Sequence, residues 1–188
     1  GVPLVRVSAH TGEGLHELVE TLQKVLAETP PKRDLDRPRL PVDRVFTLSG
    51  FGTVVTGTLL DGRFRTGEDV VCLPSALPAR VRGVQTHLRK IQTASPGYRT
   101  ALNLNGVDKA DLHRGDVIAK PGTYKPTTLI DVSCRALADN SHALKHHEAV
   151  KVYIGSAEVN ARMRLLGKVA LDPGGEAFLQ LQLEHPVV

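Results

Sequence analysis

The chain of 188 residues lacks several features that would place it in a class at once. No apolar run approaches the roughly 20 residues that a membrane-spanning helix needs, which excludes a span of that kind. Residues 1–8 turn polar too early for a secretory signal peptide. There are only two cysteines, Cys72 and Cys134, and both lie in apolar stretches without metal-ligand spacing. We therefore expect reduced core thiols in a cytoplasmic protein.

Patterns for catalysis, metal binding and phosphate binding are also missing. The sequence contains no Gly-x-x-x-x-Gly-Lys-Ser/Thr segment, so it offers no phosphate cradle. Its eight histidines show no metal spacing, since the adjacent His146 and His147 would face opposite sides of a strand. No Ser-His-Asp or Cys-His arrangement is supported, because the thiols lie in core stretches. We expect a binding protein with no catalytic residue and no metal ligand of its own.

The net charge of +4 permits a nucleic-acid partner without demanding one. Residues 2–28 read as a strand, a loop and a helix, and the acidic residues Glu13, Glu17 and Glu20 fall in the first turns of that helix, where its dipole favours them. The apolar residues there follow the i, i+3, i+4, i+7 spacing of a helix with one apolar face: Leu15, Leu18, Val19, Leu22, Val25 and Leu26. Residues 2–8 read as a strand before it. A single strand and helix cannot form a domain, so residues 1–29 look like the end of a larger one.

Residues 30–38 form a linker that is rich in proline and charge and leaves nothing to bury. Short strands separated by glycine-containing turns follow in residues 39–121. The predicted strands are Val45–Leu48, Thr53–Leu60, Val70–Leu73, Ala79–Thr86, Thr100–Leu104 and Val117–Ala119. Strands this short and frequent, without helices between them, favour a closed β-barrel.

A second boundary falls at the proline- and glycine-containing residues 121–126. Residues 122–188 contain four more predicted strands: Leu129–Leu137, Ala149–Ile154, Ala157–Leu166 and Phe178–Leu183. Residues 184–188 then stop without a terminal strand. The fold class is therefore mainly β, with two consecutive barrels, the second of them truncated.

Two glycine-containing segments resemble ligand loops. In Gly50-Phe51-Gly52 the next residues form a strand rather than a helix, so the glycines serve a tight turn. Ser8-Ala9-His10-Thr11-Gly12 lies between the predicted strand and helix, where backbone N–H groups could meet a ligand carbonyl. The alternative is an ordinary turn into the helix, capped by Thr11.

Three charged residues of the first barrel, Asp43, Arg44 and Arg99, carry the sharpest question. Neighbours on a strand face opposite ways, but just after Pro41, at the beginning of the strand, Asp43 and Arg44 could both line a rim. Arg99 precedes the strand at residues 100–104. The simple alternative is a surface ion pair worth about 0–1 kcal/mol.

Several of these segments, taken in order, resemble elongation factor Tu and the other translational GTPases. Three segments show this resemblance: Ser8-Ala9-x-Thr11-Gly12-x-Gly14, the hairpin from Phe46 to Gly57, and Arg-Gly-Asp-Val-Ile-Ala-Lys-Pro-Gly at residues 114–122. Within that group, residues 41–46 and 150–167 look most like the bacterial selenocysteine-specific elongation factor. The resemblance implies the last strand and helix of a P-loop GTPase domain, followed by translation-factor domains 2 and 3, both barrels.

This resemblance also implies roles for single residues. In the selenocysteine factor, the residues that match Asp43, Arg44 and Arg99 line the pocket for the esterified amino acid. General elongation factors have two acidic residues and a neutral one there. A selenol ionises at neutral pH, so two arginines would favour it over the neutral serine of the precursor tRNA. We expect Asp43 to orient Arg44, Ser8 and Ala9 to be a remnant of the guanine contact, and Arg162 and Arg164 to contact tRNA phosphates.

The implied partners are selenocysteinyl-tRNA and, through the parent protein, the ribosome and the mRNA hairpin for selenocysteine insertion. GTP and Mg²⁺ would belong to the parent, a GTPase, because the GTP-hydrolysing core is absent from this chain. Two alternatives stay open. One is another translational GTPase of the same group, and the other is a purely structural barrel from a GTPase-like sulfate-activating enzyme.

Overall fold

The computed structural model describes residues 2–30, 34–48, 50 and 52–188. These residues form two compact units, with the division after residue 33. In the first unit, helix α1 (Leu15–Glu28) follows a turn and has the predicted apolar face. Residues 2–8 pair with no other strand in the described part of the chain, so the predicted strand is not formed there. A strand needs the hydrogen bonds of a neighbouring strand, and this unit supplies none.

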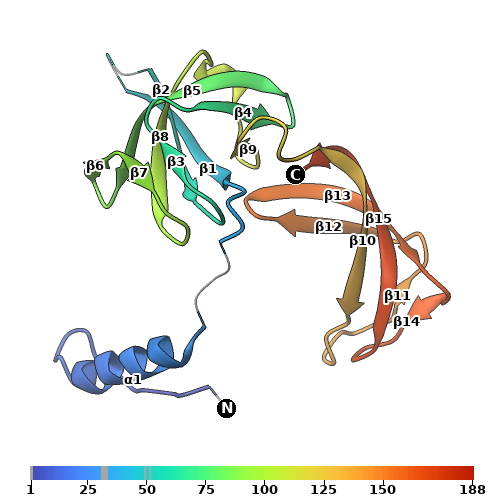
Figure 1. Ribbon diagram of the computed structural model, residues 1–188. Helices are drawn as coiled ribbons and strands as arrows, with labels where there is room; N and C mark the ends of the chain where they lie inside the picture. Colours follow the sequence, from blue (N-terminus) through green and yellow to red (C-terminus); the bar gives the residue numbers. More distant parts are fainter. Residues whose placement is uncertain (1, 31–33, 49, 51) are drawn as a thin grey trace. The chain divides into compact units, whose positions relative to one another are not determined.

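Six strands of the second unit close a barrel (Figure 1). They are β1 (Arg39–Leu48), β2 (Gly52–Thr58), β4 (Asp69–Leu73), β5 (Leu77–Thr86), β8 (Arg99–Asn105) and β9 (Val117–Ala119). Their order is β4-β9-β1-β2-β8-β5, and β5 pairs back onto β4. Every one of them overlaps a predicted strand, although β2 ends two residues before the prediction, and the prediction of a closed barrel is confirmed. Short β6 (Arg89–Ile91) pairs antiparallel with the end of β5, while β3 (Phe64–Arg65) pairs with β7 (Thr93–Ala94).

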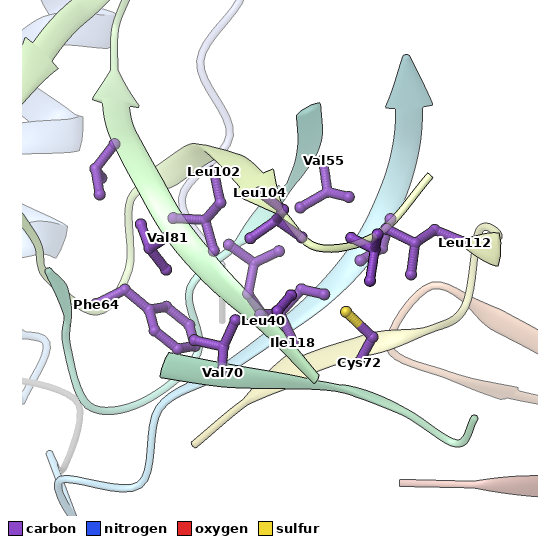
Figure 2. Packing of buried hydrophobic residues seen from close by; sticks show 14 of the residues in the cluster. Leu40, Val55, Phe64, Val70, Cys72, Val81, Leu102, Leu104, Leu112 and Ile118 are labelled. Carbon is purple, nitrogen blue, oxygen red and sulfur yellow. The ribbon is translucent and has the colours of Figure 1, made fainter. Parts of the chain in front are cut away.

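Strict alternation of side chains fills the barrel. Along β8, for example, Thr100, Leu102 and Leu104 are buried, while Arg99 and Asn105 are exposed. Figure 2 shows the result, with side chains from all around the barrel meeting in its interior. The largest fully buried ones include Phe64, Leu40, Leu59, Leu102 and Ile118. Because adjacent side chains point to opposite faces of a strand, the same alternation puts the other side chains of each strand on the outside of the barrel.

The sulfur of Cys72 lies in this interior (Figure 2). Burial raises the pKa of its thiol to about 12, so it stays protonated at neutral pH. Cys134 is half-buried and also unpaired. Both cysteines are unpaired, as expected, but only Cys72 is fully buried in the core.

The C-terminal sheets occupy residues 127–187. Four strands follow the order β10 (Thr127–Arg135), β15 (Glu176–Val187), β13 (Ala157–Leu165) and β12 (Ala149–Ile154). A small pair, β11 (Leu144–Lys145) and β14 (Ala170–Leu171), accompanies them. Among these residues β10 and β12 remain the edges of an unclosed sheet, so a second closed barrel stays a prediction. The prediction that residues 184–188 hold no strand is wrong, because β15 continues to Val187, which pairs with Thr127.

Part of the predicted linker is held on the barrel. The backbone N–H of Leu35 donates to the Asp61 carboxylate at 2.8 Å, and that of Gly62 donates to Asp34 at 3.2 Å. The Tyr124 hydroxyl donates to the carbonyl of Arg37 at 2.8 Å. Residues 31–33 of the linker lie outside the described residues. Residues 34–37 are exposed, as expected for a linker, but these hydrogen bonds tie them to the folded part of the chain, and Pro38 is buried.

Replacement of Phe64 tests the barrel core. Its side chain is 0% exposed, so Phe64→Ala should lower the free energy of unfolding by about 3–5 kcal/mol through lost burial and a cavity. Phe178→Ala is the matched control, because that ring is 70% exposed and its removal should cost less than about 0.5 kcal/mol. Urea unfolding of the chain measures both. Equal losses for the two variants would contradict the assignment of Phe64 to the core.

Candidate functional site

A β-bulge in strand β1 shapes the candidate site. Val42 pairs with Gly57 and Arg44 pairs with Thr56, which leaves Asp43 as an extra residue without a partner on β2. Val42 is fully buried inside the barrel, whereas Arg44 is exposed and Asp43 bonds to groups on the outer face. In a regular strand, Asp43 and Arg44 would face opposite sides. The extra residue thus turns both charged side chains to the outside, as was expected for the beginning of this strand.

Asp43 is bound by two side chains from neighbouring strands. Both Nη atoms of Arg99 donate to its carboxylate, Nη1 to Oδ2 and Nη2 to Oδ1, the latter at 2.8 Å. The Thr56 hydroxyl donates to Oδ1 at 2.8 Å. Strands β1, β2 and β8 are neighbours in the barrel, which is why residues so distant in sequence meet. Such a two-pronged contact fixes the direction of the guanidinium as well as its charge.

These contacts change the acid–base behaviour of the pair. The hydrogen bond from Arg99 lowers the pKa of Asp43; burial opposes this effect, and the Thr56 hydroxyl and the charge of Arg44 support it. The same hydrogen bond raises the pKa of Arg99. The Asp43 side chain is 23% exposed and that of Arg99 is 53% exposed. Both groups are therefore charged at neutral pH, in a site that water reaches from one side.

Arg44 differs from Arg99 in its partners. Its guanidinium makes no hydrogen bond or ion pair with any residue that the structure describes. The carboxylate oxygens of Asp43 bind Arg99 and Thr56, while Arg44 acts on Asp43 through its charge, so an orienting role of Asp43 toward Arg44 stays a prediction. Arg99 comes from β8, on the far side of β2 from β1, and makes a two-pronged contact. Two guanidinium groups and one carboxylate leave the trio with one net positive charge, and Arg44 is the arginine that is not hydrogen-bonded to the carboxylate.

An open groove of about 430 Å³ lies on the same outer face of the barrel. Phe46, Leu48 and Val54 provide apolar lining, Asn103 and Gln85 add polar groups, and Arg82 and Lys90 add charge. Phe46 follows Arg44 by two residues and so shares its face of β1. Ala101, which lines the groove, is the partner of Thr56 across β2 and β8. Asp43, Arg44 and Arg99 are not among the lining residues; they lie beside the groove.

The segment at Ser8 and Ala9 forms a compact turn into α1. The N–H of Gly12 donates to the Ser8 carbonyl at 2.9 Å, and the N–H of Thr11 donates to the Ser8 hydroxyl at 3.3 Å. The N-cap of α1 is Gly14 rather than Thr11. A Cβ at Gly14 would lie 2.1 Å from the Arg6 carbonyl oxygen, and its φ of 74° also favours glycine. A guanine contact at Ser8 and Ala9 stays a prediction.

The glycine turn before β2 is described only in part, because Ser49 and Phe51 lie outside the described residues. Gly50 and Gly52 have φ of 77° and 84°, as a tight turn requires. His146 and His147 do not lie on a strand as was expected; they form the turn between β11 and β12, and their ring centroids are 4.1 Å apart. The described residues contain no cluster of three or more potential metal ligands.

Arg162 and Arg164 share the exposed face of β13, opposite Gln182 and Gln180 of β15. An open hollow of about 600 Å³ beside Arg162 is also lined by Lys151 and Glu184. The two arginines thus have the exposure that a phosphate contact needs, but they lie in a mixed rather than a purely basic surface. Within the described residues, no helix is long and apolar enough to cross a membrane.

Comparisons with known proteins agree with this architecture. Residues 52–119 match the family described as elongation factor Tu domain 2. The selenocysteine-specific elongation factor of Desulfomicrobium baculatum is 42% identical over 187 residues, which cover 100% of this chain and 30% of that protein. Elongation factor 1-alpha of Pyrobaculum aerophilum is 38% identical over 127 residues, 67% of this chain and 27% of that protein.

Two solved structures are also similar. The crystal structure of a bacterial selenocysteine-specific elongation factor has a TM-score of 0.81 and 29% identity, and the match covers 97% of this chain and 29% of that one. The apo form of the translation elongation factor SelB from Methanococcus maripaludis also has a TM-score of 0.81, with 26% identity over 96% of this chain and 43% of that one. The chain belongs to the selenocysteine-specific elongation factors, within the elongation factor Tu-like translation factors. It spans less than a third of the length of the curated relatives named above.

The lowered pKa of Asp43 gives the stability a defined pH dependence. Its ion pair contributes stability above the ordinary pKa of an aspartate, about 3.9, and this contribution is lost as the pH falls through the lower folded-state pKa. Asp43→Asn should therefore show a smaller loss of stability than the wild type below about pH 4. Solvent screening of the exposed Arg99 keeps the difference small.

Urea titrations of the chain at a series of pH values measure this effect. Arg99→Ala should flatten the acid limb in the same way as Asp43→Asn, because the carboxylate loses the same partner. The double variant should then match the single variants. An acid limb of undiminished size in Asp43→Asn contradicts the assignment.

Proposed function

We propose that this chain is the part of a selenocysteine-specific elongation factor that holds the aminoacyl end of selenocysteinyl-tRNA. In this proposal Asp43, Arg44 and Arg99 form the pocket for the esterified amino acid. The observation that carries it is the β-bulge, which gathers one carboxylate and two guanidinium groups on one face of the barrel. A surface ion pair needs no third charge and no extra residue in a strand, so the arrangement favours a ligand site over that simpler reading.

The charges of the trio favour an ionised ligand. A selenolate placed near Arg44 would interact with a cation that makes no hydrogen bond or ion pair with a described residue. One such pair at 4 Å is worth about 4 kcal/mol at an effective dielectric constant of 20, before desolvation is subtracted. The serine hydroxyl is neutral and gains none of this attraction. Arg99 adds less than Arg44, because Asp43 already neutralises it, but its fixed guanidinium keeps a second donor beside the site.

The neighbouring groove suits the 3′ end of the tRNA. Aromatic and aliphatic side chains form a platform on which a base can stack, and stacking is worth about 1–3 kcal/mol per base. Phe46 provides the aromatic face, and Gln85 provides a polar group for the base edge or the ribose. An amino acid esterified to that end would extend toward the row of Thr56 and Ala101, beside which Asp43 and Arg99 lie.

The C-terminal sheets would contact the tRNA backbone. Arg162 and Arg164, on the exposed face of β13, are suited to phosphate oxygens that run along the sheet. Such contacts position the RNA without reading its sequence. They would give the complex a marked dependence on salt concentration.

The remaining functions belong to the parent protein in this proposal. GTP binding, Mg²⁺ binding and GTP hydrolysis would use residues outside this chain, which has no phosphate-binding glycine motif. The parent would deliver selenocysteinyl-tRNA to the ribosome in the cytoplasm and recognise the mRNA hairpin for selenocysteine insertion. The chain itself contributes binding and selection.

Charge removal in the parent factor tests the pocket. Arg44→Ala and Arg99→Ala should each reduce the preference for selenocysteinyl-tRNA over seryl-tRNA. For Arg44→Ala the preference should fall about tenfold or more, because one close charge pair is lost. Equilibrium binding of both tRNAs to each variant measures the preference. Arg135→Ala is the matched control, since that exposed arginine pairs with Glu176 in the C-terminal sheets. Undiminished preference in both pocket variants would favour a general elongation factor or a structural barrel.

Removal of the aromatic platform should have a different result. Phe46→Ala should weaken selenocysteinyl-tRNA and seryl-tRNA equally, by about five- to a hundredfold, because both tRNAs end in the same nucleotides. The ratio of the two dissociation constants should stay as in the wild type. Loss of preference without a common loss of affinity would contradict the assignment of the groove to the 3′ end.

A further inference from the structure

Two donors hold the peptide group that joins Val42 to Asp43, and both act on its carbonyl oxygen. The N–H of Val42, which belongs to the preceding peptide group, donates to the Asp116 carbonyl at 2.7 Å. The Val42 carbonyl accepts the N–H of Gly115 at 2.9 Å. That carbonyl also accepts the hydroxyl of Ser156 at 2.7 Å. Ser156 does not belong to the barrel. It lies in the turn between β12 and β13 of the C-terminal sheets, which reaches β1 at this point (Figure 1).

This contact is built at close range on both sides. Gly155 has a φ of 59°, and a Cβ there would lie 3.1 Å from two carbons of the Pro41 ring. A Cβ at Gly115 would lie 3.0 Å from the Cα of Ala157. A side chain at either position, 115 or 155, would therefore obstruct the approach of the turn to β1. Arg114 Nε donates to the Ser156 carbonyl at 3.3 Å and holds the turn from the barrel side.

The carbonyl of Val42 belongs to the same planar unit as the nitrogen of Asp43. When its oxygen is fixed by two donors, the plane is fixed, and the direction of the Asp43 Cβ depends only on the remaining backbone angles of that residue. Asp43 is the extra residue of the bulge, so no partner on β2 fixes it in the usual way. The hydroxyl of Ser156 thus acts next to the one residue of the candidate pocket on β1 whose backbone has no partner on β2.

We propose that Ser156 is a positioning residue for the Asp43–Arg99 pair, so that the C-terminal sheets help to set the amino acid pocket of the barrel. The consequence for tRNA selection rests on the proposed function above, whereas the effect on Asp43 does not. Ser156 touches no ligand in this proposal. It acts through the Val42 carbonyl and the peptide plane that follows it.

The first experiment is a carboxyl NMR titration of Asp43 in the 188-residue chain. Ser156→Ala should raise the pKa of Asp43 toward its ordinary value, because a freer peptide plane weakens the two-pronged contact with Arg99. Ser156→Thr keeps the hydroxyl and should restore the wild-type pKa. Ser141→Ala is the matched control, since that hydroxyl contacts only the adjacent His142 ring in an exposed loop. An Asp43 pKa that is the same in Ser156→Ala and the wild type overturns the proposal, even where the variant melts at a lower temperature.

The second experiment measures the binding of both tRNAs to the parent factor. Ser156→Ala should reduce the preference for selenocysteinyl-tRNA by about three- to tenfold, the effect of one lost hydrogen bond, while Ser156→Thr retains it. Arg99→Ala is measured in parallel. If Arg99→Ala leaves the preference unchanged, the proposed function of the pocket fails. If Arg99→Ala reduces the preference and Ser156→Ala does not, or weakens both tRNAs equally, the role of Ser156 in selection fails.

Discussion

The extra residue in strand β1 is the constraint on which the candidate site depends. A strand alternates its side chains strictly, so a buried Val42 would ordinarily allow only one of the next two residues to face outward. The bulge removes that limit at one place and keeps Val42 in the core. Asp43 and Arg44 then lie on the same outer face, where Arg99 of strand β8 and Thr56 of strand β2 can meet the carboxylate. A regular strand with the same sequence would bury one of the two charges.

The barrel and the C-terminal sheets meet at the beginning of this bulge. Pairing of β1 with β2 and of β2 with β8 places Asp43, Thr56 and Arg99 side by side. The turn between β12 and β13 then adds a hydroxyl to the Val42 carbonyl, at a distance that only glycine at residues 115 and 155 allows without rearrangement. Packing of the two parts and geometry of the charged trio are thus linked through one peptide group. This link matters under the proposed function, since selection of an amino acid needs side chains held in fixed directions.

The sequence predicted the barrel well because its strands are short, strongly alternating and separated by glycine-containing turns. Each of the six barrel strands overlaps a predicted segment. The prediction from sequence was less accurate where a segment's structure depends on contacts with another part of the chain. Residues 2–8 have strand-forming side chains but no neighbouring strand, and the linker residues 34–38 look fully solvated although Asp61, Gly62 and Tyr124 bind them. The extension of β15 to Val187 was missed because its partner, Thr127, lies some sixty residues earlier in the chain.

The sequence by itself therefore determined the class of fold, the family and the three charged residues of the candidate pocket, because alternation and the order of several motifs are local properties of the chain. Only the tertiary structure decided how those charges are shared. It pairs Asp43 with Arg99 rather than with its neighbour, and it leaves Arg44 as the arginine that is not hydrogen-bonded to the carboxylate. It also brings Ser156 to the Val42 carbonyl across more than a hundred residues. Register, bulge position and the docking of one turn are long-range outcomes, and no local pattern encodes them.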